Sequence, residues 1–314
     1  MQSVLIVGAT GVLGKELIPR LSAKGLRVRG LVRPESKEKL EKAMAEGLPE
    51  FEAVFGNIMD KASLLEATTG IDVVISAVSA GQDRTAESRG NAEHFGQMNL
   101  IDAAKANAVK QFIFTSTLFP KNALGYSFVW AKLMTEEKLR DSGLTYTIFR
   151  PCGFFYELYY RGAPFVEATN MFPILGDGKS TTQMLAEQDV AKMYAAAVGN
   201  AACFGKTLEI GGGRIMTFDD LIAEWSRVRE KVEGKSVLPM HIPLTPTRIL
   251  AEMIKPFYEQ AWGLVHLLDF SYDSMACDMT EPKRLLGITE DMMTLEAYIT
   301  EAYEKKYGGK LLVG

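Results

Sequence analysis

A glycine-rich turn near the N-terminus is the feature that most restricts how this chain can fold. Residues 8–14 read Gly-Ala-Thr-Gly-Val-Leu-Gly, between the apolar run Ser3–Val7 and the amphipathic segment Gly11–Lys24. A strand that turns this tightly into a helix needs residues without a Cβ, and the N–H groups that begin the helix favour a phosphate. With a strand before it and a helix after it, the turn predicts a dinucleotide pyrophosphate site and not only a tight connection.

The first 150 residues alternate β-rich and helical patterns. The predicted strands are Ser3–Val7, Arg27–Val32, Phe51–Phe55, Asp72–Ser76, Gln111–Thr115 and Tyr146–Arg150. The predicted helices are Gly11–Lys24, Glu35–Ala45, Lys61–Ala67, Gly90–Asn107 and Phe128–Asp141. Such alternation gives right-handed βαβ units, so we predict an α/β fold with a doubly wound parallel sheet of the Rossmann type.

The second half of the chain predicts a smaller, mostly helical C-terminal lobe. Residues 154–172 look irregular and aromatic, and the sequence from Pro239 onward looks helical with proline breaks. Helix Glu187–Gly199 and strand Thr207–Ile210 are expected to return to the sheet, and Met216–Glu233 to form a helix of the lobe. The predicted domains are 1–153 plus 185–211, which binds the cofactor, and 154–184 plus 212–314, which holds the substrate.

Composition narrows the function classes. The 314 residues are 47% hydrophobic and 24% charged, with a net charge of -4, which suits a globular protein and gives no general reason to bind nucleic acid. The three cysteines and three histidines lie far apart, so neither a disulfide framework nor a metal site is expected. No apolar run reaches membrane-spanning length. We predict a soluble monomer or homodimer in the cytoplasm, or in an organelle stroma if a transit peptide has been removed.

The residues after the second strand favour one cofactor. A carboxylate about 20 residues after the glycines would hold the ribose 2′-hydroxyl of NAD. The chain has Arg33 there, followed by Lys37, and these cations suit the 2′-phosphate of NADPH. The alternative is that both are solvated residues at the start of a helix.

These residues resemble the atypical branch of the short-chain dehydrogenase/reductase superfamily, with NmrA-like and isoflavone-reductase-like proteins. The resemblance rests on the glycine loop, on Gly56-Asn57 where relatives have Gly-Asp, and on the strand Val73–Ala77, which passes under the cofactor ribose in that family. It implies the following cofactor-binding residues: Gly8, Thr10, Gly11, Val12, Leu13, Gly14, Arg33, Lys37, Asn57, Ile58, Ser76, Ala77, Val78, Thr115, Lys132, Pro151 and Cys152.

The catalytic position departs from the superfamily pattern of a serine followed by Tyr-x-x-x-Lys. Ser116 and Lys132 are in place, but Phe128 stands where the tyrosine is expected and cannot donate a proton. Three explanations stay open. Tyr126 is the proton donor, or the site has lost its chemistry and the protein is a sensor, or the reaction does not protonate a carbonyl oxygen through that position. The predicted catalytic residues are Lys132, Ser116 and Tyr126.

The order of later segments is similar to the divinyl chlorophyllide 8-vinyl reductase branch. The segments are Arg150–Phe155, Leu175–Lys179, Glu187–Ala191 and Ile210–Gly213, together with the helix that carries lysine alone. This resemblance implies NADPH-dependent reduction of a hydrophobic or conjugated acceptor, such as a vinyl group of a chlorophyll precursor. Its predicted contacts are Phe128, Phe154, Phe155, Tyr156 and Tyr159, although an aromatic core explains the last four equally well. The rival functions are an NADP(H)-binding redox sensor without turnover and a structural subunit with a fixed nucleotide.

Overall fold

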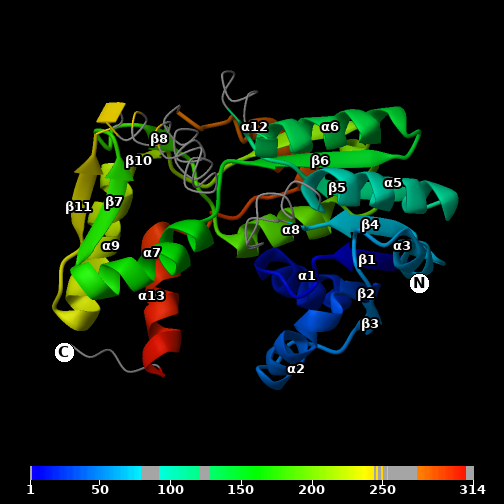
Figure 1. Cartoon of the computed structure of the whole chain (residues 1–314), viewed down its shortest axis with the longest axis horizontal. Coiled ribbons are helices and arrows are strands. Elements are labelled where there is room, and N and C mark those ends of the chain that lie inside the picture. The colour runs from blue at the N-terminus through cyan, green and yellow to red at the C-terminus, as the bar shows by residue number, and fades with distance from the viewer. Residues whose placement is uncertain are drawn as a thin grey trace.

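A seven-stranded parallel sheet forms the larger part of the molecule (Figure 1). The computed structural model describes residues 2–78, 92–119, 127–243 and 274–308, together with 245, 246, 249 and 253. The strand order is β3-β2-β1-β4-β5-β6-β9. The strands are β1 (Ser3–Val7), β2 (Arg27–Val32), β3 (Glu52–Phe55), β4 (Val73–Ser76), β5 (Gln111–Thr115), β6 (Tyr146–Pro151) and β9 (Lys206–Ile210). The predicted Rossmann fold is confirmed, including the return of 206–210 to the sheet edge.

Helices cover both faces of this sheet. They are α1 (Val12–Ala23), α2 (Lys37–Ala45), α3 (Lys61–Thr68), α5 (Gln97–Ala106), α6 (Ser127–Asp141) and α8 (Glu187–Ala197), with a short 3-10 turn at Pro34–Ser36. Alternation along β1 explains the two layers, because Ile6 packs with Leu17 and Val190 of α1 and α8, whereas Leu5 packs with the layer of α3 and α5. Both neighbours of β1 are parallel to it, and the strand order reverses between β1 and β4.

The second lobe lies on the far side of the molecule from the N-terminus (Figure 1). Its elements are α7 (Phe155–Thr169), β7 (Met171–Leu175), β8 (Thr181–Thr182), β10 (Met216–Thr217), α9 (Phe218–Glu233), β11 (Leu238–Ile242) and α13 (Leu295–Tyr307). β7 pairs with β11 in parallel and β8 with β10 antiparallel. Trp225, fully buried, lies in a core with Tyr159, Ile222 and Ile299. A short helix, α12 (Thr280–Leu286), joins this lobe's C-terminal segment to the sheet.

One sequence prediction for this lobe was wrong, and a second was wrong at its start. Residues 154–172 were expected to be irregular, but α7 occupies most of them, because burial of Phe155, Leu158, Tyr159 and Val166 along one face outweighs the cost of Pro164 inside the helix. The segment from Pro239 was expected to be helical, and it does contain α12 and α13, but it begins inside strand β11. A proline is tolerated there because β11 belongs to a two-stranded pair with an open edge.

The predicted helix Gly90–Asn107 is interrupted. Residues 92–96 form a π-turn before α5 begins at Gln97, and residues 90 and 91 lie outside the described part. Gly96 fits tightly there, since a Cβ on it would lie 2.8 Å from Cγ2 of Ile58. The interruption changes the side-chain phase by one residue, which matters for Glu93.

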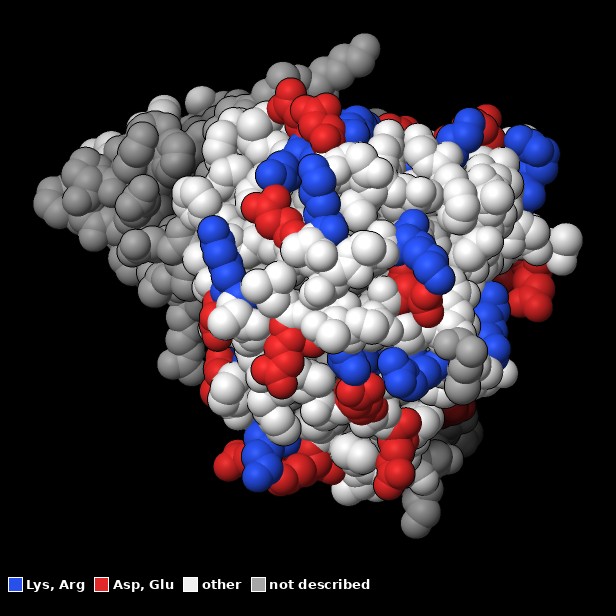
Figure 2. Space-filling view, turned by 90° about the vertical axis from the view of Figure 1, so that its right-hand side faces the viewer, with Lys and Arg blue, Asp and Glu red and all other residues white. Residues whose placement is uncertain are grey.

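The surface carries charges of both signs. Figure 2 shows Lys and Arg side chains interspersed with Asp and Glu over the face on the right of Figure 1. Of the helices that the structure describes, none has the length and apolar character needed to cross a bilayer. Within the same residues, no group of three or more His, Cys, Asp or Glu is arranged to hold a metal ion.

Candidate active site

The glycine loop closes β1 against the end of β4, at the point where the strand order reverses. Gly8 has φ +98°, and a Cβ on it would lie 2.9 Å from the carbonyl oxygen of Ala77. A Cβ on Gly14 would lie 2.2 Å from the oxygen of Gly8, and the N–H of Gly11 donates to that oxygen over 2.9 Å. Gly11, the N-cap of α1, has no side chain to cap the helix. The loop therefore presents backbone N–H groups where parallel α/β sheets bind ligands, so its shape fits a pyrophosphate.

A cluster of cations lies beside this loop. Arg33 follows β2, Lys15 follows Gly14, and Lys39 lies on α2. Burial lowers the pKa of Lys39, and the nearby charges of Lys15 and Arg33 lower it further. Lys39 is thus repelled by two cations, which favours an anion beside the phosphate loop, and Arg33 also contacts Glu35 over 3.6 Å. Lys37, the predicted partner of Arg33, instead contacts Glu41 at 4.0 Å.

Lys132 lies at the carboxyl ends of β4 and β5. Its ammonium is buried and forms an ion pair with Glu93, with 2.5 Å between Nζ and Oε2. It also donates to the carbonyl oxygens of Thr115 (3.0 Å) and Val78 (3.4 Å). Two hydrogen bonds and one ion pair thus engage an ammonium that has three N–H donors. A cofactor ribose can bind Nζ only by replacing one of them.

Glu93 is placed by the π-turn. Its backbone carbonyl accepts from the hydroxyl of Thr135 on α6 over 3.3 Å, which fixes the turn against the helix that carries Lys132. His94, next along the turn, has its ring 4.8 Å from the ring of Trp130 on the same helix. Both carboxylate and ammonium are about 2% to 3% exposed, so their attraction is only weakly screened.

Ser116 is bound into a different network. Its hydroxyl donates to Oε1 of Glu136 over 2.5 Å, and Arg150 donates to both carboxylate oxygens at 2.9 and 2.7 Å. Burial raises the pKa of Glu136, but the hydrogen bonds from Arg150 and Ser116 outweigh it and hold that pKa below its ordinary value. Ser116 thus holds a buried carboxylate in this structure.

The predicted residues Ser76 and Thr115 also bind protein groups. The hydroxyl of Ser76 donates to Gln97 over 2.8 Å, and that of Thr115 donates to the carbonyl oxygen of Ser76 over 2.7 Å. Tyr194 on α8 donates to Thr115 over 2.9 Å, and burial raises the pKa of Tyr194. These contacts fix the ends of β4 and β5 under the site.

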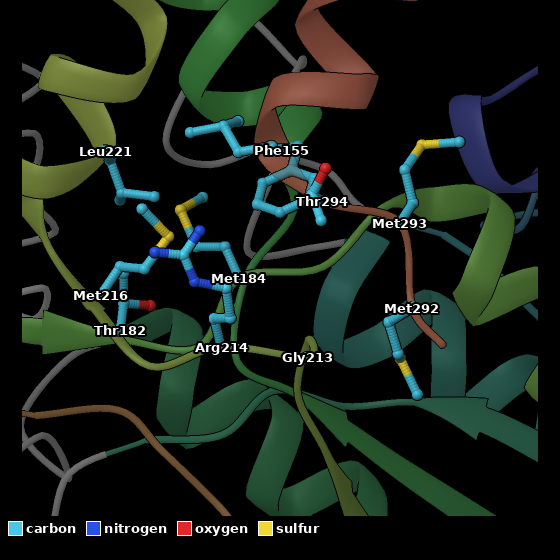
Figure 3. A pocket seen from close by; sticks show the side chains of 11 residues that line it. Phe155, Thr182, Met184, Gly213, Arg214, Met216, Leu221, Met292, Met293 and Thr294 are labelled. Atoms are coloured by element: carbon cyan, nitrogen blue, oxygen red, sulfur yellow. The ribbon is translucent and has the colours of Figure 1, made fainter. Parts of the chain in front are cut away.

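A small cavity of about 20 Å³ lies within the second lobe, where residues from 155–184, 213–221 and 292–295 meet (Figure 3). Its lining combines four methionines with few polar groups: Phe155, Thr182, Met184, Gly213, Arg214, Met216, Leu221, Met292, Met293, Thr294 and Leu295. The hydroxyl of Thr182 is buried and has no hydrogen-bond partner among the described residues. The cavity has room for water but not for an aromatic molecule, so a larger ligand requires the flexible methionine side chains to move.

The other predicted residues are scattered. Phe128 has its ring 5.7 Å from the Lys132 ammonium, and Phe154 forms a β-bridge to Leu185. Tyr159 is buried against Trp225, and the ring of Tyr156 lies 5.1 Å from that of Tyr160. Of the predicted acceptor contacts, Phe155 alone lines the cavity.

Three further predicted cofactor residues lie at or just beyond the carboxyl ends of strands β3 and β6. The side chain of Asn57 accepts from the N–H of Met59 over 3.0 Å, and Ile58 is buried. Pro151 ends β6. Tyr126 lies outside the described residues.

Sequence reasoning missed Glu93, Lys15, Lys39 and the methionine cavity. The signal for Lys39 was present, because Leu40 and Ala43 are the buried residues of α2 and Lys39 adjoins them. No local sequence pattern predicts that Glu93 contacts Lys132, because the position of Glu93 depends on a π-turn within an otherwise helical sequence.

Comparison with known proteins agrees with this architecture. The family described as NAD(P)H-binding matches residues 8–201. The chain belongs to this family of NAD(P)H-binding proteins, and among solved structures it is similar to NADPH-dependent quinone oxidoreductase QOR2 of Escherichia coli in complex with NADPH. That structure has a TM-score of 0.72 and 23% identity over 96% of this chain and 99% of the other, a likeness of fold.

The individual relatives include an enzyme and a protein named for its role in assembly. Quinone oxidoreductase 2 of Escherichia coli is 32% identical, covering 74% of this chain and 76% of the relative. The photosystem II assembly factor Ycf39 of Cyanophora paradoxa is 28% identical, covering 96% of this chain and 92% of the relative. The relatives thus include an oxidoreductase and an assembly factor.

Proposed function

We propose that the protein is an NADPH-dependent reductase of a flat, conjugated, mostly apolar acceptor. In this proposal residues 1–153 with 185–211 hold the cofactor, and 154–184 with 212–314 hold the acceptor. The observation that carries it is the position of Lys132, a buried ammonium at the carboxyl ends of β4 and β5, beyond a glycine loop shaped for pyrophosphate.

The cations beside the glycine loop favour NADPH over NADH as the cofactor. Arg33, Lys39 and Lys15 offer positive charge beside the loop, and a 2′-phosphate relieves the repulsion of Lys39 by the other two. NADPH supplies a hydride when bound. The chain's own residues orient the cofactor through backbone N–H groups, and Glu93 positions the Lys132 ammonium through the ion pair.

The acceptor class follows from the apolar lining and from the missing phenol. Phe128 cannot protonate a carbonyl oxygen, so the site suits acceptors whose conjugation spreads the added charge, such as quinones or a vinyl group on a chlorophyll precursor. The apolar lining of the methionine cavity favours a flat, hydrophobic acceptor, which can enter once the methionine side chains move.

The test combines binding with turnover. NADPH and NADH are titrated by fluorescence, and NADPH oxidation is then followed with a series of benzoquinones and naphthoquinones and with a divinyl chlorophyllide. Tighter NADPH binding and turnover that Lys132→Met abolishes are expected. Tight NADPH binding without oxidation by any acceptor would overturn the reductase proposal.

A second function has its own support. The three N–H donors of Lys132 are matched by protein acceptors, and Ser116 is bound to Glu136, an arrangement that suits a protein which binds NADP(H) without turnover. Relatives named as assembly factors align over nearly the whole chain. Under this alternative, NADPH binding changes affinity for a protein partner, and pull-downs with and without NADPH distinguish the two.

A further inference from the structure

Two cysteines that are distant in the sequence face each other where the lobes meet. Cys152 follows Pro151 at the end of β6, and Cys277 lies in the segment that leads to α12. Their sulfur atoms are 3.7 Å apart, although 125 positions separate the residues. A disulfide has an S–S length of about 2.05 Å, so a movement of less than about 2 Å brings them to bonding distance.

The surrounding backbone holds both residues in place. The N–H of Cys152 donates to the carbonyl oxygen of Ile210, and the N–H of Cys277 donates to Oε1 of Gln183, both over 2.9 Å. The amide of Gln183 in turn donates to the carbonyl oxygen of Gly212 over 2.8 Å. These hydrogen bonds therefore hold the two thiols close to each other.

The two thiols differ in access and acidity. Cys152 is 2% exposed, whereas Cys277 is partly exposed. The Cys152 thiol donates a hydrogen bond to Cys277, which lowers the pKa of Cys277 against the opposing effect of burial and raises that of Cys152. Cys277 is therefore the attacking sulfur, and Cys152 the sulfur that resolves.

We propose that Cys152 and Cys277 form a reversible disulfide modification site that joins the lobes. The Cys277 thiolate attacks glutathione disulfide and releases one glutathione, and the Cys152 sulfur then displaces the second. Both cysteines are oxidised, one glutathione disulfide is reduced to two thiols, and these take the two protons that the cysteines lose.

The bond fixes one wall of the methionine cavity. Met275 is bridged to Thr182, and Cys277 binds Gln183, which stands between the cavity residues Thr182 and Met184. Oxidation therefore restrains the side chains that must move to admit a large acceptor. This consequence rests on the proposed function, whereas formation of the disulfide does not.

The test treats the full chain with glutathione disulfide and maps the products by mass spectrometry. We expect a loss of about 2 Da, a peptide linking Cys152 to Cys277, an increased Tm and full reversal by dithiothreitol. Cys203, also buried, is the matched control, and Cys203→Ser should oxidise like the wild type. A stable glutathione adduct on Cys277 in the wild type, a disulfide involving Cys203, or no reaction would overturn the proposal.

Two variants and an activity measurement complete the test. Cys152→Ser should stop at a glutathione adduct on Cys277, and Cys277→Ser should stay unmodified. A linked product in either variant would contradict the assigned roles. If the reductase proposal holds, the oxidised wild type turns over bulky quinones more slowly than the reduced protein. Unchanged turnover in a mass-verified disulfide form overturns only the cavity restraint.

Discussion

The two ends of the proposed cofactor site differ in how many of their hydrogen-bonding and charged groups are already engaged by the protein itself. At the phosphate end, the loop from Gly8 to Gly14 presents N–H groups without a side-chain cap, beside cations that repel one another. At the reacting end, Lys132 is matched by three protein acceptors and Ser116 is bound to Glu136. The phosphate end is organised for a ligand, whereas the reacting end must exchange protein contacts for cofactor contacts.

The largest effect is expected from substitutions that remove one partner of the Lys132–Glu93 ion pair. Removing one partner of a buried ion pair leaves an uncompensated charge and costs about 3–5 kcal/mol. We expect Lys132→Met and Glu93→Gln each to lower the free energy of unfolding by about this much, measured by urea denaturation.

The double variant Glu93→Gln with Lys132→Met is the control for charge. It should regain part of the stability of either single variant, because no buried charge is left unpaired, while turnover stays lost. Glu66→Gln, on an exposed part of α3, should be silent. Additive losses in the double variant would show that the two groups do not act as a pair.

At the phosphate end, Gly11→Val should abolish cofactor binding. The substituent would begin 3.0 Å from the oxygen of Gly8 and would occupy the space in front of the helix N-terminus. We expect NADPH affinity to fall by more than about 100-fold, or about 2.7 kcal/mol, with the fold preserved. Ala23→Val, at the exposed end of α1, is the control, and normal binding by Gly11→Val would mean that the loop has another role.

The same end offers a test of cofactor choice. Arg33→Ala should weaken NADPH by about 10-fold to 100-fold, or about 1.5–3 kcal/mol, through loss of a charge-assisted contact, and leave NADH nearly unchanged. Lys39→Ala should act in the same direction and Lys37→Ala should not, which calorimetric titration can decide. Arg27→Ala, exposed at the start of β2, is the control.

The comparison also explains what the sequence could reveal. The phosphate end is built from consecutive residues, because glycine spacing, a strand and a helix define it locally, so its position and the sheet around it were predictable. The reacting end depends on tertiary contacts. Glu93 reaches Lys132 only because a π-turn interrupts the expected helix, and Ser116 meets Glu136 from another element. The second lobe was less predictable, because packing stabilises α7 despite Pro164 and an open strand edge tolerates Pro239.

A smaller effect is expected at Ser116. If its hydroxyl only supports Glu136, Ser116→Ala should cost about 1 kcal/mol of stability and leave turnover largely intact. The lowered pKa of Glu136 contributes stability that is present above its unfolded value and is lost as pH falls through its folded value. Removing the hydrogen bond raises the folded pKa, so acid unfolding should begin at a slightly higher pH. Abolished turnover in a folded Ser116→Ala would instead assign the serine to catalysis.

The smallest effect is expected at Phe128, whose ring lies one helical turn before Lys132. Phe128→Leu keeps an apolar side chain and should change stability by less than about 1.5 kcal/mol and turnover little. Phe128→Tyr places a phenol where the superfamily has its proton donor. It should leave reduction of conjugated acceptors unimproved, because their added charge is spread over the conjugated system, and should create weak activity toward simple ketones. NADPH oxidation by matched quinone and ketone substrates measures both. A large gain with quinones in Phe128→Tyr would show that the wild-type reacting end lacks a proton donor and that conjugation of the acceptor does not replace one.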